Sequence, residues 1–149
     1  MQKVIQLNSA NLHHLHALRS QVLRPGLPIE ASYYPEDTQD ETLHLAIGDN
    51  QEQLSAIATF IEQKSPLFAQ QQQYRLRGMA TAELKRRQGL GSRLLLAAFL
   101  ILKGRNIELI WCNARVNALS FYKYHGFKII GEEFDIPGIG PHFIMKKLL

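Results

Sequence analysis

The chain has one cysteine among its 149 residues. It therefore cannot form an internal disulfide or a thiolate metal site, which excludes disulfide-rich secreted scaffolds and zinc fingers. The sequence also lacks an apolar run near the ~18–20 residues that a membrane-spanning helix needs. Its N-terminal segment carries three histidines where a signal peptide would have an apolar stretch. We therefore expect a soluble cytoplasmic protein with no membrane partner.

The length and the hydrophobic content of 46% are those of one folded domain that spans residues 1–149. The formal net charge is only +4, but it is unevenly distributed along the chain. Residues 1–62 carry three basic and eight acidic side chains, whereas residues 75–93 carry six basic side chains and one acidic side chain. Such a local excess of positive charge favours an anionic ligand: a small molecule with phosphate groups, a nucleic acid or an acidic partner.

Hydrophobic periodicity predicts an alternation of strands and helices. One helix follows a cap at Asn8 or Ser9 and ends at residue 23, and Gly104 ends another. The order of elements indicates the α/β (α+β mixed sheet) class, with one mixed sheet and helices on its faces. The other predicted helices span 89–103 and 116–125; the predicted strands span 4–7, 43–47, 54–62, 74–81, 107–112, 127–130 and 142–147, the last two joined by a Gly/Pro-rich loop at 137–141.

The segment between a predicted strand and the helix at 89–103 has the composition of a phosphate site. Gly89 and Gly91 stand at the start of the helix, where unpaired backbone N–H groups and the helix dipole attract anions. Three cations precede them, at 85–87. The segment matches neither the dinucleotide-binding fingerprint, since position 94 is leucine, nor the P-loop. By spacing alone, a tight turn with a solvated basic loop stays open as the alternative.

Two motifs in the expected order resemble those of the GNAT superfamily of N-acyltransferases. Residues 76–81 and 86–95 resemble its acetyl-CoA-binding motif, [Q/R]-x-x-G-x-[G/A], which Arg86, Gly89 and Gly91 match. Residues 113–127 resemble the second motif, A-x-x-F-Y-x-x-x-G-F. The chain departs from the common pattern at Glu83 and Arg87, where many members have proline and glycine. The resemblance implies the GNAT-type fold, acetyl-CoA as the co-substrate, no metal and frequent homodimers.

The resemblance also implies a role for each residue that matches a motif. Tyr122 would point its hydroxyl at the sulfur of coenzyme A, and Asn113 and Asn117 would contact the pantetheine arm, with Asn117 as a helix cap in the alternative interpretation. The remaining cofactor-binding positions would act through their backbone groups. In the strand, the residues that would pair with the pantetheine arm are Met79, Ala80 and Thr81. In the loop and at the helix start, the residues that would hold the diphosphate are Arg86, Arg87, Gln88, Gly89, Leu90, Gly91 and Ser92.

Transfer of an acyl group from a thioester to an amine needs a neutral amine, an oxyanion site and a proton for the leaving thiolate. Backbone N–H groups near Met79 and Ala80 would form the oxyanion site. Tyr122 is protonated at neutral pH and would supply the proton; the alternative is an aromatic packed beside Phe121. Tyr124 lies roughly 200° further around the helix and faces elsewhere.

His142 is the base that we favour, ahead of Glu62, His44, Glu36 and an ordered water; a histidine held by the backbone is the alternative interpretation. The acidic stretch at 30–41 predicts attraction of a cationic amine, or else a solvated loop, and neutralising Glu36, Asp37 and Asp40 would then raise the acceptor KM. We expect Cys112 to be a core residue. The three histidines at 13, 14 and 16 indicate a solvated helix more than a metal site.

The sequence therefore predicts an N-acetyltransferase that moves an acetyl group from acetyl-CoA to a primary amine, of a small molecule or a peptide, by direct attack in a ternary complex. The alternative is a non-catalytic acyl-CoA-binding sensor with the same fold. A nucleic-acid binder is disfavoured, because the basic residues gather at one loop and helix start and not along an exposed face. We expect the positive segment at 75–93 to hold the phosphates of coenzyme A.

Overall fold

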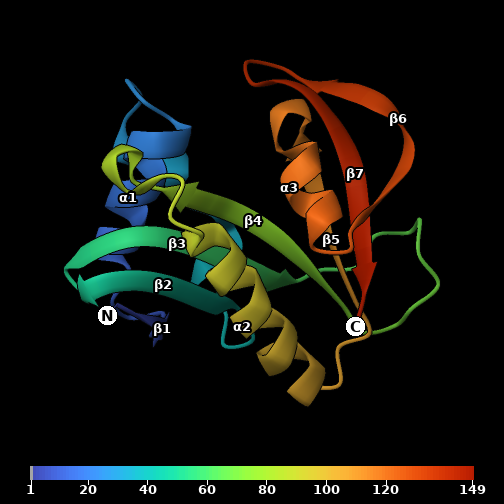
Figure 1. Ribbon diagram of the computed structural model, residues 1–149, viewed down its shortest axis with the longest axis horizontal. Coiled ribbons are helices and arrows are strands. Elements are labelled where there is room, and N and C mark those ends of the chain that lie inside the picture. The colour runs from blue at the N-terminus through green and yellow to red at the C-terminus, as the bar shows by residue number, and fades with distance from the viewer. Residues whose placement is uncertain (1) are drawn as a thin grey trace.

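A computed structural model describes residues 2–149 and shows one seven-stranded sheet over that range, in the order β1-β2-β3-β4-β5-β7-β6 (Figure 1). All neighbouring strands are antiparallel except β4 and β5. No helix within 2–149 is long and apolar enough to span a membrane. The strands are β1 (Lys3–Leu7), β2 (Leu43–Asn50), β3 (Gln53–Glu62), β4 (Gln73–Thr81), β5 (Leu109–Arg115), β6 (Lys128–Ile136) and β7 (Gly140–Leu148); the helices are α1 (His13–Leu23), α2 (Leu90–Gly104) and α3 (Leu119–Tyr124).

The predicted order of strands and helices is confirmed, but the ends of several elements differ. The helix α1 begins at His13, because the Asn8 side chain accepts the N–H of Ala10 at 2.8 Å and closes a turn before the helix. The strands β6 and β7 are longer than predicted, and the Gly/Pro-rich loop shrinks to a hairpin turn in which Ile139 N donates to Ile136 O at 3.0 Å. Short 3₁₀ turns at 29–32 and 35–38 occupy the acidic stretch.

Alternation along β2 and β3 builds a core on each face of the sheet. On one face, Leu45 and Phe60 pack beneath α2, whose buried side includes Leu94. On the other face, Ile57 packs with Leu15 of α1. Figure 1 shows α2 crossing one face of β2 and β3, with α1 behind the sheet. Both helices also contact β4, which carries much of the site.

The strands β4 and β5 separate soon after they begin. They pair at three positions, where residues 73–75 of β4 face residues 109–111 of β5. Beyond these positions, no further pair joins them in the described part of the chain. There β4 stays paired with β3 only, and β5 stays paired with β7 only. The strand β4 also carries an irregularity around Gly78, whose φ is +63°. Figure 1 shows the resulting V between β4 and the β5–β7 pair. A gap between the carboxyl ends of two parallel strands is a common place for a ligand.

Candidate active site

Two cavities lie on the two sides of this gap. The first, the strand cavity, has a volume of about 340 Å³ and is lined by 75–79 of β4, 112–115 of β5, the end of α1 and the β6–β7 hairpin. The second, the helix cavity, has a volume of about 550 Å³ and is lined by 79–81, by the loop and first turn of α2, and by α3. The two cavities share Met79, Ala118 and Tyr122. Two ligands bound in them would therefore meet at these residues.

The helix cavity contains the free N-terminus of α2. Gly89 precedes the helix with a φ of +74°, and the first helical hydrogen bond joins Arg93 N to Gly89 O at 3.1 Å. No side chain among residues 2–149 caps this end, so the N–H groups of 90–92 lack a helical or side-chain acceptor. A Cβ on Gly91 would lie 3.1 Å from Phe121 Cζ, so glycine at this position avoids a close contact between α2 and α3. The observed arrangement fits a diphosphate.

Arg87 takes the backbone conformation that a glycine would take. Its φ is +63°, one of two positive values outside glycine within 2–149. The left-handed region costs a residue with a Cβ roughly 1–2 kcal/mol. Arg87 therefore stands where many GNAT sequences have glycine, but its backbone has the left-handed conformation that glycine adopts readily. The arginine adds a cation to the wall of the helix cavity.

Tyr122 lies at the junction of the two cavities, on α3. It is 8% exposed, and its Oη lies 3.9 Å from Met79 Sδ. Its ring packs edge-on against Phe121 and Phe127. Burial raises the pKa of Tyr122 above the ordinary value, so its hydroxyl remains a proton donor well above neutral pH. Tyr124 is 85% exposed, which confirms that the two tyrosines face different ways.

His142 lines the strand cavity from β7, opposite Arg115 of β5. Its Nδ1 lies 2.7 Å from Gly140 O. Because a carbonyl oxygen only accepts, Nδ1 carries a proton, and Nε2 of the neutral ring keeps a free lone pair. The backbone thus holds one nitrogen of the ring and leaves the other as a proton acceptor.

The other predicted bases are placed away from both cavities. His44 is buried with both ring nitrogens bonded: Nε2 donates to Asp37 O and Nδ1 accepts from Thr59 Oγ1, each at 2.9 Å. Burial lowers the pKa of His44, in keeping with a neutral structural residue. Within residues 2–149, neither Glu36 nor Glu62 is among the lining residues of either cavity.

Most of the predicted cofactor-binding residues line the helix cavity, and two do not. Over the described range 2–149, Gln88 lines neither cavity, and Asn113 lines the strand cavity. The expectation that 75–93 forms one phosphate clamp is wrong, because Arg75 and Arg77 face the strand cavity and Arg93 donates to Gln2 O at 2.7 Å. The predicted residues along the helix cavity are Met79, Ala80, Thr81, Arg86, Arg87, Gly89, Leu90, Gly91, Ser92 and Asn117.

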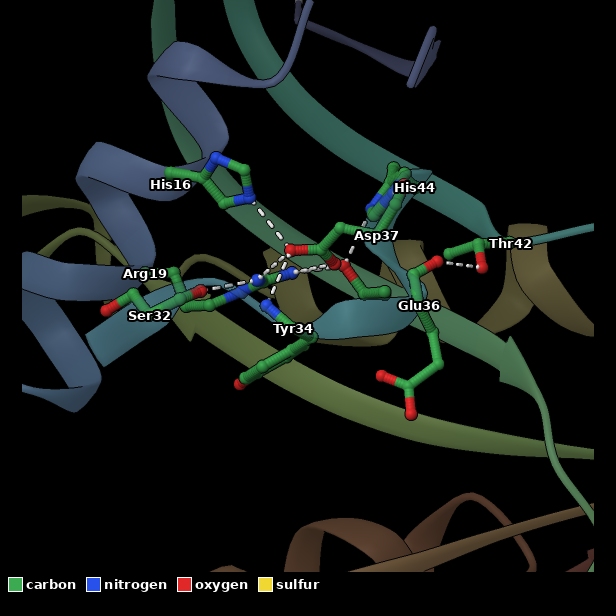
Figure 2. A network of polar contacts seen from close by, with 9 residues as sticks. His16, Arg19, Ser32, Tyr34, Glu36, Asp37, Thr42 and His44 are labelled. Atoms are coloured by element: carbon green, nitrogen blue, oxygen red, sulfur yellow. Dashed lines mark hydrogen bonds and ion pairs between the residues drawn. The ribbon is translucent and has the colours of Figure 1, made fainter. Parts of the chain in front are cut away.

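A buried ion pair between Arg19 and Asp37, which the sequence analysis missed, lies next to Tyr34 of the strand cavity, and Figure 2 shows its polar contacts. Arg19 is fully buried in α1 and donates from Nη1 and Nη2 to the two carboxylate oxygens of Asp37, at 2.8 and 3.2 Å. His16 Nε2 and the N–H of Tyr34 also donate to Asp37, at 2.8 and 3.0 Å. Burial alone would raise the pKa of Asp37, but these donors and the charge of Arg19 outweigh it and hold the pKa well below its usual range.

The expectation that Asp37 attracts a substrate is therefore wrong, because a cation of the chain itself already occupies it. His16, likewise, is not simply solvated. Among residues 2–149, no group of three or more His, Cys, Asp or Glu could hold a metal ion. A signal for this network was present in the sequence. Arg19 follows Leu15 by four residues, so it falls on the apolar stripe of its helix, where a cation needs a buried partner.

The ion pair reaches the strand cavity through Tyr34. The guanidinium of Arg19 lies 3.8 Å from the centre of the Tyr34 ring, and that of Arg77 lies 3.9 Å from it. Arg19 also packs against Gly78, where an added Cβ would lie 2.8 Å from its Nε. Cys112, another lining residue, is 2% exposed, and burial raises the pKa of its thiol to about 12. The thiol is therefore unreactive, as expected of a core residue.

The comparisons with known proteins agree with the two motifs and the fold. A model of the acetyltransferase (GNAT) domain family matches residues 29–149. The chain belongs to this family. It is 38% identical over 146 residues to the uncharacterized N-acetyltransferase YitI of Bacillus subtilis (strain 168), covering 98% of this chain and 97% of that protein. This GNAT protein is therefore an acyl-CoA-dependent N-acetyltransferase.

Solved structures show the same fold at low sequence identity. Escherichia coli ElaA is 19% identical with a TM-score of 0.80, and the match covers 99% of each chain. An aminoglycoside 6′-N-acetyltransferase complexed with coenzyme A is 17% identical with a TM-score of 0.70, covering 98% of this chain and 96% of that one. The GNAT-type fold predicted from the motifs is confirmed.

Proposed function

We propose that this acetyltransferase moves the acetyl group of acetyl-CoA to a primary amine by direct attack while both substrates are bound. The helix cavity holds the coenzyme, and the strand cavity holds the amine. The observation that carries this proposal is the contact between the cavities, which share Met79, Ala118 and Tyr122. When bound, acetyl-CoA supplies an acetyl group that is activated as a thioester.

The residues of the helix cavity bind and orient the coenzyme. The N–H groups of 90–92 and the cations at 85–87 line this cavity and would hold the diphosphate. The stretch of β4 that has no β5 partner offers its backbone to an extended arm, as Met79, Ala80 and Thr81 are expected to do. One such N–H group would polarise the reacting carbonyl.

Two side chains move the protons. Tyr122 donates its phenolic proton to the leaving thiolate, since burial keeps this hydroxyl protonated. His142 accepts a proton from the amine at Nε2, because Nδ1–H is fixed on Gly140 O. The two residues line the strand cavity together.

Release of free thiol from acetyl-CoA across a panel of primary amines, with mass detection of the products, tests the proposal. We expect one thiol per acetylated amine. Binding of acetyl-CoA without thiol release from any amine would contradict the proposal and support the sensor alternative.

Replacing His142 with glutamine should lower kcat by about 10²-fold at neutral pH, the low end of the range for a general base. The loss should shrink as the pH rises, because more of the amine is then neutral in solution. Steady-state rates between pH 6.5 and 9.5 check this. The exposed His13→Gln is the matched control. A loss that is constant over this pH range would contradict a role in deprotonation.

Replacing Arg87 with glycine should weaken acetyl-CoA binding a few-fold, since an exposed ion pair contributes at most about 1 kcal/mol. Stability should change little, because relief of the left-handed strain offsets the greater freedom of glycine in the unfolded chain. Calorimetric titration and thermal unfolding measure the two effects. Equal affinities would place the Arg87 charge outside the diphosphate site.

A further inference from the structure

The strand cavity is strongly positive. Four arginines line it, Arg24, Arg75, Arg77 and Arg115, and no acidic residue among 2–149 does so. They come from the end of α1, from β4 and from the end of β5, so only the folded chain brings them together. None of the four forms an ion pair with another described residue. Their charge is therefore available to a ligand.

Aromatic rings and a backbone carbonyl hold three of these arginines in place. Arg77 stacks on Tyr34 at 3.9 Å, and Arg75 lies 5.1 Å from the centre of a Trp111 ring. Arg24 donates from Nη1 to the carbonyl of Leu23 at 2.9 Å. A guanidinium that is already positioned loses less freedom when it binds an oxyanion.

Arg75 also has a donor without an acceptor. Its Nε is buried and has no hydrogen-bond partner within 2–149, and its Nη1 makes one long contact of 3.5 Å with Gln63. Burial, then the charge of Arg77, lower the pKa of Arg75, and the nearby Glu36 acts against them without forming an ion pair. Figure 2 shows the Glu36 side chain directed away from the Asp37 network. An unsatisfied buried donor is costly and is commonly satisfied by a ligand at a functional site.

We infer that the acceptor amine carries an oxyanion, a carboxylate or a phosphate group, which the arginines of the strand cavity bind. The inference rests on the proposed function, because it assigns the strand cavity to the amine. Guanidinium groups pair with both kinds of oxyanion through two parallel N–H donors. The cavity, at about 340 Å³, is at the small end of ligand pockets, which favours a small molecule.

The same charge assists the chemistry. Neighbouring cations disfavour the protonated form of an amine, so a bound amine loses its proton more easily beside four arginines. His142 then accepts a proton from an ammonium group whose pKa the neighbouring arginines already lower. A polyamine, which would suit the acidic stretch at 30–41, meets repulsion in this cavity, so we replace that expectation.

The test compares amines in matched pairs that differ only in the oxyanion. One arm pairs β-alanine with n-propylamine and L-phenylalanine with phenethylamine; the other pairs O-phosphoethanolamine with ethanolamine; spermidine represents the cationic class. We expect kcat/KM for thiol release to be roughly 10- to 100-fold higher for the anionic member of at least one arm, as a charge-assisted hydrogen bond provides. The arm that shows the preference identifies the oxyanion as carboxylate or phosphate.

The variants Arg75→Gln and Arg77→Gln should reduce this ratio toward one, while acetyl-CoA affinity, measured by calorimetry, shows that each variant is folded. Arg105→Gln, at an exposed arginine outside both cavities, should keep the ratio. Thiol release that is equal or faster with the neutral or cationic members overturns the inference and leaves the proposed function standing. Absence of thiol release with every amine overturns the proposed function and the inference with it.

Discussion

Replacing Tyr122 with phenylalanine should lower kcat by roughly 10²- to 10⁴-fold, the range for loss of a general acid. The leaving thiolate would then have no positioned proton donor at the junction of the two cavities. Affinity for acetyl-CoA should stay close to that of the parent protein, because the substitution removes one oxygen and keeps the ring. Single-turnover rates and calorimetric titration separate the two quantities.

The contacts of Tyr122 argue against a structural explanation for such a loss. Among residues 2–149, its hydroxyl makes one weak contact, at 3.9 Å to Met79 Sδ, so removing it should leave the packing and the melting temperature nearly unchanged. Tyr124→Phe, at a residue that is 85% exposed on the same helix, is the matched control and should retain full activity. Full activity in the Tyr122 variant would remove this residue from the mechanism.

The pH profile offers a second check on Tyr122. Burial raises the pKa of its hydroxyl above the ordinary value of about 10, so the donor form persists to higher pH than it would in an exposed tyrosine. The rate should therefore show no alkaline decline from this group below about pH 10. A decline near pH 8 that disappears in the phenylalanine variant would contradict the assignment.

The parts of the site that depend on local sequence were predicted from it. Gly89 and Gly91 signal a helix start that can hold phosphate, and the helical period places Tyr122 and Tyr124 on different sides. These signals are local because a turn or a helix face depends on neighbours within a few residues. The order of strands and helices along the chain was predicted for the same reason.

The composition of the strand cavity could be predicted only in part. Arg75 and Arg77 are two residues apart in a strand and so share one face, which separates them from the cations of the loop. The alternation of side chains along a strand therefore predicts this separation, which the net charge of 75–93 does not show. Arg24 and Arg115 reach the same cavity from distant elements, and nothing in the local sequence predicts this meeting.

The buried network of Arg19 and Asp37 contacts the wall of the strand cavity. Arg19 packs against Gly78, where β4 is irregular. Its guanidinium also lies over the Tyr34 ring, on which Arg77 stacks as well. The position of the cavity wall therefore depends on an ion pair whose residues line neither cavity. Residue Asp37 holds that ion pair, so its substitution should affect stability first.

Replacing Asp37 with asparagine should destabilise the protein by about 3–5 kcal/mol, the cost of leaving one charge of a buried pair without its partner. Asparagine keeps the shape but removes the charge that faces Arg19, which is fully buried. Urea unfolding measures the loss. The exposed Asp40→Asn is the matched control, and should change the free energy of unfolding by no more than about 0.5 kcal/mol.

Removing both charges tests whether the loss arises from the pair. The double variant Arg19→Met with Asp37→Leu should lose less stability than the sum of the two single variants, by at least about 1 kcal/mol. If the double variant loses as much stability as the two single variants together, the two residues act independently, and the ion pair is not the cause of the loss.

Acid sensitivity follows from the same pair. Because the pKa of Asp37 is lower in the folded protein than in the unfolded chain, its stabilisation is fully present above the unfolded value of about 4 and is lost as the pH falls from there toward the folded value. The parent protein should therefore lose stability between about pH 5 and pH 2 more steeply than Asp37→Asn, since asparagine has no proton to gain. Parallel pH profiles for the two proteins would mean that the folded carboxyl has its ordinary pKa, and the arrangement of Arg19, His16 and Asp37 would then be wrong.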